Sequence, residues 1–272
     1  MLKKLMKHEL RATGRIMLPL FLLLMVTAVS ANLSTRTLLE ADNKALNALG
    51  VLFMTAFALA IAAVCFMSCA LMVYRFYKNF LQDEGYVMMT LPVSVHQQLT
   101  SKLLVSMIWF ILSLLAVMAA FFILAYQVGI VKEIANALRA VFTDVFDSGY
   151  GFDAALFAFE MVVLVFFSAV TACLHFYLAL AIGHSFPAKK LLWSVVFYFV
   201  IQMALNTLGS FAMFSLQKLS FLDIFGTDVF TGMSSIAMAQ SVICGLIVVS
   251  ALGAALFYFP TAWFLKHRLN LE

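Results

Sequence analysis

Polar side chains that could bind a proton, a cation or a solute are few in this chain, and they recur at helical spacing within two apolar stretches. Glu160 is the one carboxylate inside an apolar stretch. At about 100° per residue, Glu160 and three later residues fall within a stripe roughly 80° wide on one helix face. The members of this first stripe are Glu160, Ser168, Thr171 and His175. A second stripe, in the next apolar stretch, steps by four and consists of Ser194, Tyr198, Gln202 and Asn206.

Two interpretations of these stripes follow from their hydroxyl, imidazole and amide groups. Polar groups avoid lipid, so both stripes should face protein or a cavity. They either line a path for a solute or join helices through hydrogen bonds worth about 0.6 kcal/mol each. Glu160 is close to the start of its stretch, where it can also reach lipid headgroups. It is about 22 Å from His175 at 1.5 Å per residue, too far for direct proton transfer.

Catalytic and cofactor motifs are missing from the sequence. No G-x-x-x-x-G-K-[ST] is present, so the chain has no phosphate-binding loop of its own. His8 and Glu9 begin an H-E-x-x-H, but position 12 is alanine, and there is no G-x-S-x-G. The four cysteines have neither a zinc-binding nor a disulfide spacing. We therefore expect no enzyme activity, no catalytic residue, no metal and no cofactor in this chain.

The composition places these residues in a membrane. Of the 272 residues, 65% are apolar and 11% are charged, whereas a soluble domain has about 25% charged residues. So little charge cannot cover a water-soluble globule of this size, and disorder requires low hydrophobicity. The net charge of +4 comes from basic residues at the ends of apolar stretches, which does not indicate nucleic-acid binding. We expect an all-α, polytopic membrane protein.

Six stretches are long enough to cross a bilayer, which requires roughly 20 apolar residues. The six spans are expected at about 16–35, 49–74, 103–128, 155–183, 191–214 and 240–264. With six spans, both termini lie on one side. That side holds 12 of the 17 lysines and arginines, so the positive-inside rule predicts cytoplasmic termini. The three tryptophans, near predicted cytoplasmic span ends, agree with this orientation.

The first 15 residues are basic and amphipathic. Leu2, Leu5, Met6 and Leu10 share one helical face, and the basic residues lie largely elsewhere. This pattern predicts an interfacial helix over residues 1–15 on the inner leaflet, followed by one membrane domain over 16–272. A plain basic tail explains the same charges. A cleaved signal peptide, ending near Val29-Ser30-Ala31, is a third interpretation.

Residues 75–102 form a long cytoplasmic loop that itself contains helical signals. Helix can continue from span two to Gly85, a natural stop. Ser94 and Gln97 form a capping box that begins the helix of span three. The loop is thus predicted to be a helical hairpin with Asp83 and Glu84 near its turn. Such a hairpin either docks onto another protein or lies at the interface and ties two spans together.

Four segments resemble the membrane permease subunits of ABC-2-type exporters. They are residues 7–15 (Lys-His-Glu-Leu-Arg-Ala-Thr-Gly-Arg), 78–86 (Lys-Asn-Phe-Leu-Gln-Asp-Glu-Gly-Tyr), 90–94 (Thr-Leu-Pro-Val-Ser) and 101–104 (Ser-Lys-Leu-Leu). The six-span count with cytoplasmic termini fits this family along the whole chain. The resemblance implies that residues 1–15 are a connecting helix, that 184–190 are a second coupling element, and that 215–239 form an extracellular re-entrant region. It gives no role to the amphipathic segment at 132–153.

The resemblance further implies a partner that supplies energy. The hairpin would be a coupling loop seated on a cytoplasmic ABC ATPase, which would hold ATP and Mg²⁺. The residues implied in this contact are Phe76, Tyr77, Lys78, Asp83, Glu84, Gly85 and Tyr86. A second permease chain, identical or different, would complete the unit in the cytoplasmic membrane. The stripe residues other than Ser194 would line the path of a hydrophobic or amphipathic cargo: a peptide, a lipid-linked molecule or a drug.

Two other classes of function remain open at this point. A stand-alone ion-coupled transporter or channel would need an ion gradient, and Glu160 would then be essential. A non-transporting membrane protein, such as an immunity or assembly factor, would need no path through the membrane.

Overall fold

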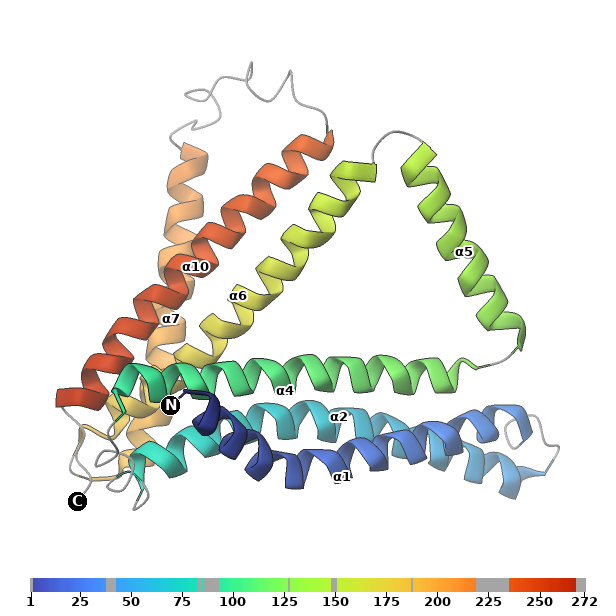
Figure 1. Ribbon diagram of the computed structural model, residues 1–272, viewed down its shortest axis with the longest axis horizontal. Helices are drawn as coiled ribbons and strands as arrows, with labels where there is room; N and C mark the ends of the chain where they lie inside the picture. The colour runs from blue at the N-terminus through green and yellow to red at the C-terminus, as the bar shows by residue number, and fades with distance from the viewer. Residues whose placement is uncertain are drawn as a thin grey trace. The chain divides into compact units, whose positions relative to one another are not determined.

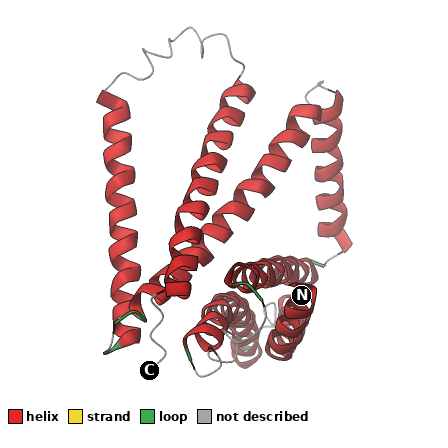
Figure 2. Cartoon of the chain, turned by 60° about the vertical axis from the view of Figure 1, so that its left-hand side comes forward, coloured by secondary structure: helices red, strands yellow, loops and turns green. Residues whose placement is uncertain are grey.

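A computed structural model of the chain describes residues 2–37, 43–82, 85, 93–126, 128–147, 151–186, 188–218 and 235–267. The regular structure in these residues is helical throughout (Figures 1 and 2). The helices are α1 (Leu2–Thr37), α2 (Lys44–Leu81), α4 (Val95–Leu124), α5 (Val128–Asp147), α6 (Gly151–Gly183), α7 (Lys190–Lys218) and α10 (Ser235–His267).

The described helices include six that are long and apolar enough to cross a membrane, and α5 is the one that is not. Each coincides with one of the six expected spans, so the prediction of an all-helical, multi-pass membrane protein is confirmed at this level. Only helices satisfy every backbone hydrogen bond within one lipid-exposed segment, which is why long apolar stretches must take this form.

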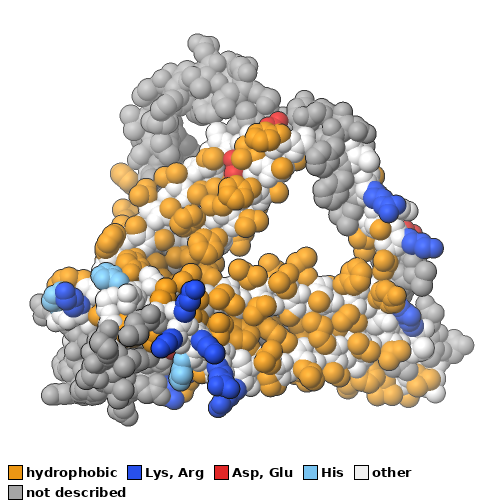
Figure 3. Space-filling view, viewed as in Figure 1, with side chains coloured by type: hydrophobic (Ala, Val, Ile, Leu, Met, Phe, Trp, Pro, Cys, Tyr) orange, Lys and Arg blue, Asp and Glu red, His pale blue; other side chains and the backbone are white. Residues whose placement is uncertain are grey.

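Large apolar side chains cover the outside of these helices. Phe66, Met203 and Leu59 are 74%, 73% and 70% exposed, respectively. In the view of Figure 3, apolar side chains cover most of the described surface of the long helices. Such a surface would associate in water, but lipid tails solvate it. Such an apolar outer surface is typical of a protein that is surrounded by lipid.

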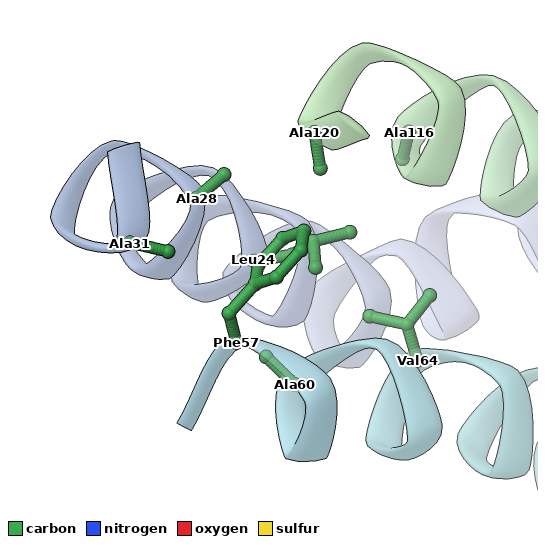
Figure 4. Packing of buried hydrophobic residues seen from close by; sticks show 8 residues of the cluster. All are labelled: Leu24, Ala28, Ala31, Phe57, Ala60, Val64, Ala116 and Ala120. Carbon is green, nitrogen blue, oxygen red and sulfur yellow. The ribbon is translucent and has the colours of Figure 1, made fainter. Parts of the chain in front are cut away.

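The chain divides into two compact units, Met1–Arg75 with His96–Ser148, and Phe76–Val95 with Gly149–Glu272. In the first unit, α1, α2 and α4 pack around small side chains (Figure 4). Four alanines at this contact, Ala28, Ala31, Ala60 and Ala120, are at most 5% exposed. Helices in membranes associate where small residues let their backbones approach. A hydrogen bond of 2.7 Å between the hydroxyls of Ser68 and Ser113 also joins α2 to α4.

The third span ends earlier than expected. It was predicted to run to residue 128, but α4 ends at Leu124 and α5 begins at Val128. The side-chain amide of Asn32 donates to the carbonyls of Ile123 and Leu124 at 3.0 and 2.7 Å. The last carbonyls of a helix have no partner within it. Asn32 on α1 therefore supplies hydrogen bonds to the last carbonyls of α4. The apolar stretch in the sequence continues past this point and does not indicate where the helix ends.

The N-terminal segment is continuous with the first span. The residues predicted as an interfacial helix, 1–15, and those of the first expected span belong to one helix, because α1 runs unbroken from Leu2 to Thr37. Figure 1 shows α1 changing direction in its N-terminal part, and Pro19 inside the helix removes a backbone hydrogen bond there.

In the second unit, α6 packs against both α7 and α10. Contacts between α6 and α10 advance in the same direction along both helices, from Asp153 with Gln240 to Thr171 with Ser250. The two helices are therefore parallel, as two spans separated by one other span must be. The short turn from α6 to α7 brings Gly183 against Ser194, so closely that a Cβ on Gly183 would overlap the Ser194 backbone.

Candidate functional site

A cavity of about 340 Å³ lies among α6, α7 and α10 of the second unit. Its lining includes five of the seven residues that the sequence predicts for a path: Ser168, Thr171, His175, Tyr198 and Gln202. Glu160 and Asn206 are not in the lining. The structure thus brings the two polar stripes together at one cavity, with Ser250 and Phe257 of α10 added. No periodic signal in the sequence marks these two α10 residues.

The base of the cavity is aromatic. His175 and Phe257 are 6% and 3% exposed, and their rings are stacked with centroids 5.4 Å apart. The His175 ring also stacks on Tyr198, with ring centroids 4.5 Å apart and an interplanar angle of 17°. Buried polar atoms nearly always have hydrogen-bond partners, but Nε2 of His175 has none. Among the described residues, that nitrogen is a buried polar atom of the site without a hydrogen-bond partner.

Some stripe residues do join helices, as the second interpretation predicted. The hydroxyl of Thr171 lies 2.9 Å from the carbonyl of Ser250 on α10, and 2.9 Å from the carbonyl of Phe167 on its own helix. The amide of Gln202 donates to Asn206 at 3.3 Å along α7. The stripes therefore combine helix contacts with a cavity wall.

Glu160 is buried away from this cavity. It is 7% exposed, and its Oε1 accepts a hydrogen bond from the thiol of Cys244 on α10 at 3.5 Å. Its Oε2 has no hydrogen-bond partner. Glu160 therefore packs against a neighbouring helix and does not extend outward as an exposed side chain.

The start of the expected coupling loop is anchored inside the second unit. Phe76 and Phe80 are fully buried, and the Phe76 ring stacks on Tyr177 of α6 at 4.0 Å and 7°. Tyr77 contacts the ring of His184 edge to face at 5.4 Å. The sequence predicts Phe76 to be part of a contact with an ATPase, and that contact stays a prediction. In the structure its buried ring joins the start of the hairpin to α6.

The remaining hairpin residues are only partly described. Lys78 is half-buried and Gly85 is buried, and the Gly85 amide donates to the carbonyl of Gln82 at 2.7 Å. Ser94 directly precedes α4, in the position of the predicted cap. Asp83, Glu84 and Tyr86 lie outside the described residues, as do 219–234 of the expected re-entrant region.

His184, just past the end of α6, has a perturbed environment. It is 2% exposed, and its Nδ1 lies 2.9 Å from the Leu180 carbonyl. Burial lowers the pKa of His184 below its ordinary value of 6.5, and the charge of Lys190 acts in the same direction. The hydrogen bond to Leu180 opposes this shift. Lys189 nearby has a φ of 51°, a conformation that marks the tight turn into α7.

A buried ion cluster in the first unit was not found from the sequence. Glu9, 6% exposed, binds Lys102 at 2.8 Å and Nε of Arg75 at 3.2 Å. One turn later, Thr13 accepts a hydrogen bond of 2.6 Å from the indole of Trp109. Two features of the sequence could have indicated this cluster. Glu9 and Thr13 share one helix face, and Lys102 lies at the edge of an apolar stretch, where a buried lysine requires an anionic partner.

The described residues contain no group of three or more His, Cys, Asp or Glu side chains able to hold a metal ion. Comparisons with protein-family models, with curated proteins and with solved structures found no match to this chain.

Proposed function

We propose that this chain is the membrane subunit of an ATP-driven exporter of the ABC-2 type. In this proposal it moves a hydrophobic or amphipathic cargo across the cytoplasmic membrane, with both termini in the cytoplasm. Two permease chains and two ATPase subunits form the working unit, and the ATPases hold ATP and Mg²⁺. The resemblance of the N-terminal and hairpin segments supports the choice of family, and the contacts of α6 support the mechanism.

The observation that carries the proposal is that one helix contacts both the hairpin base and the cavity. Tyr177 of α6 contacts Phe76, and His184, just past the end of α6, contacts Tyr77. His175 of the same helix lines the cavity. His175 and Tyr177 are two residues apart, about 3 Å along the helix axis. A helix is stiff over such a distance, so a displacement of the hairpin displaces the cavity wall.

The mechanism follows from this connection. ATPase closure moves the hairpin, and the fully buried Phe76 transmits the movement to Tyr177 because close-packed interiors yield little. Helix α6 then shifts against α7 and α10. The stacking of His175 on Tyr198 and Phe257 changes, and the cavity alternates between accepting and releasing cargo.

Co-purification tests the assignment. The chain should bring down a soluble ATPase that carries G-x-x-x-x-G-K-[ST], and Asp83→Lys with Glu84→Lys should release it by reversing the charge of the hairpin tip. Glu133→Lys on α5, an exposed position, is the matched control and should leave the ATPase bound. An ATPase that persists in the double variant refutes the coupling role of the hairpin. Cargo movement in nucleotide-free vesicles refutes the exporter assignment.

Glu160 favours a second candidate, an ion-coupled transporter. A buried carboxylate in a span with an oxygen that lacks a partner is a typical ion or proton site. The two candidates differ in the effect of Glu160→Gln, which keeps the shape and removes the charge. ATP-driven transport should survive this change because Glu160 is not in the cavity lining, whereas gradient-driven transport should be lost.

A further inference from the structure

We propose that the cavity among α6, α7 and α10 takes an uncharged molecule with a flat aromatic ring system and at least one hydrogen-bonding group. That such molecules are the cargo of an exporter rests on the proposed function. That they bind here is argued from the cavity alone.

The lining excludes charged ligands. Among the described residues, serine, threonine, histidine, glutamine, aromatic and aliphatic side chains line the cavity, and none of these is Asp, Glu, Lys or Arg. A charged group that leaves water for such a site loses its hydration and gains no counter-charge, which disfavours binding strongly. The site therefore selects against ionised acids, protonated aliphatic amines and phosphorylated molecules.

The aromatic side chains select for a flat ligand. Tyr198 stacks on both His175 and Phe176, with interplanar angles of 17° and 16°. Phe257 lies at 21° to His175. These rings stack on one another and form one nearly parallel aromatic wall. A planar ring system can extend that wall by offset stacking, the arrangement that aromatic pairs prefer.

The described lining leaves several polar groups for a ligand: the hydroxyls of Ser168, Tyr198 and Ser250, and one ring nitrogen that is buried. The hydroxyl of Thr171 is already bonded to Ser250, and the amide of Gln202 to Asn206. Nε2 of His175 is buried without a partner, which disfavours the empty cavity. A ligand N–H, hydroxyl or carbonyl at this nitrogen, according to the histidine tautomer, would satisfy it.

The position of the cavity agrees with entry from the bilayer. His175 is eight residues before the end of α6, about 12 Å along the axis, so the site lies at membrane depth. Ser168, Ala172 and Leu205 of the lining are exposed, whereas His175 and Phe257 are buried. The cavity thus opens beside membrane-spanning surface, and its volume of about 340 Å³ is at the lower end for small-molecule sites.

Three matched probes test this inference on the full chain in lipid nanodiscs, without an ATPase. N-phenyl-1-naphthylamine is flat, uncharged and carries one N–H. 8-Anilino-1-naphthalenesulfonate adds an anionic group to the same skeleton, and 1-benzylnaphthalene replaces the N–H by CH₂. Fluorescence titration, corrected with empty nanodiscs, should show saturable binding of the amine at least tenfold tighter than that of the sulfonate.

Three substitutions locate the binding. Ala172→Phe fills the mouth of the cavity and should abolish saturable binding, while Ala158→Phe, exposed on the same helix outside the lining, should not. His175→Phe keeps an aromatic ring and removes the nitrogen. It should weaken binding of N-phenyl-1-naphthylamine about three- to tenfold, the size of one hydrogen bond. The affinity of 1-benzylnaphthalene, measured by competition, should be unchanged. Size-exclusion profiles verify folding, and Ala172→Leu serves if the phenylalanine variant does not fold.

The outcomes separate this inference from the proposed function. Equal affinity for amine and sulfonate, or equal binding by the Ala172 and Ala158 variants, overturns the ligand class. Saturable binding that the Ala172 variant loses, in a protein that associates with no ATPase, supports the ligand class and overturns the exporter. ATP-driven transport without binding of the amine supports the exporter and overturns the ligand class.

Discussion

Replacing Glu9 by glutamine should destabilise the first unit more than replacing either of its partners. The substitution keeps the size of the side chain and removes the negative charge beside two cations. Lys102 is 5% exposed and its Nζ lies 2.8 Å from Glu9. Removing one member of a buried ion pair costs about 3–5 kcal/mol, because the other charge stays desolvated. Lys102→Met should cost only about 1–2 kcal/mol, because Arg75 remains beside the carboxylate.

The assay is equilibrium unfolding in mixed micelles of a mild detergent and dodecyl sulfate, followed by tryptophan fluorescence. Glu133→Gln is the control, since Glu133 is exposed on α5, and it should change the free energy of unfolding by less than about 0.5 kcal/mol. Raising the salt concentration should leave the Glu9→Gln effect intact, because buried pairs are weakly screened.

Two results would refute this reasoning. One is a loss below about 1 kcal/mol for Glu9→Gln, the range typical of exposed ion pairs. The other is a larger loss for Lys102→Met than for Glu9→Gln, which would mean that the carboxylate is not the centre of the cluster.

Three further changes concern the second unit, and each is measured by the same unfolding assay. Phe76→Ala should cost about 3–5 kcal/mol because the ring is fully buried. Gly183→Ala should cost about 1–3 kcal/mol because its Cβ would overlap the backbone of Ser194. His184 should make the protein less stable in acid, because its pKa in the folded state is below 6.5. Its contribution to the free energy of unfolding is full above about pH 6.5. That contribution is lost as the pH falls, because the unfolded chain takes up the proton more readily. His184→Gln should flatten this part of the pH profile.

Controls and contrary results differ among the three. Phe76→Leu fills more of the space and should cost less than the alanine variant, and equal losses would argue against the ring stack. Gly209→Ala has nothing within 4 Å of its new Cβ and should be neutral or stabilise α7 by up to about 1 kcal/mol. A comparable loss at Gly209 would contradict the steric argument for Gly183. Identical pH profiles for the wild type and the His184 variant would show that this histidine does not titrate differently on folding.

The sequence alone was sufficient to predict the positions of the long helices and the polar residues that α6 and α7 contribute to the cavity. Span positions follow from the length of apolar runs, because a bilayer demands helices about 20 residues long. The phase of the stripes likewise follows from 3.6 residues per turn, so Thr171, His175 and Tyr198 could be placed on inward faces. These are local properties of a chain in a known solvent.

Other features of the structure depend on which helix faces pack against each other, and no local sequence pattern encodes that packing. Phe76 looked like an exposed aromatic of a loop, but it is stacked on Tyr177, a residue 101 positions later. Glu9 looked like part of a surface helix, but Lys102 and Arg75 come from two other helices.

The cavity shows the same division most directly. Its polar residues on α6 and α7 follow from periodicity, whereas Phe257 at its base belongs to an α10 that has no polar stripe to reveal it. Periodicity fixes the direction of a side chain about its own helix axis. The partner across a membrane helix contact is chosen by close approach, at sites such as Gly253 of α10, where an added Cβ would lie 3.3 Å from Thr171 of α6. Only the folded chain brings such sites together.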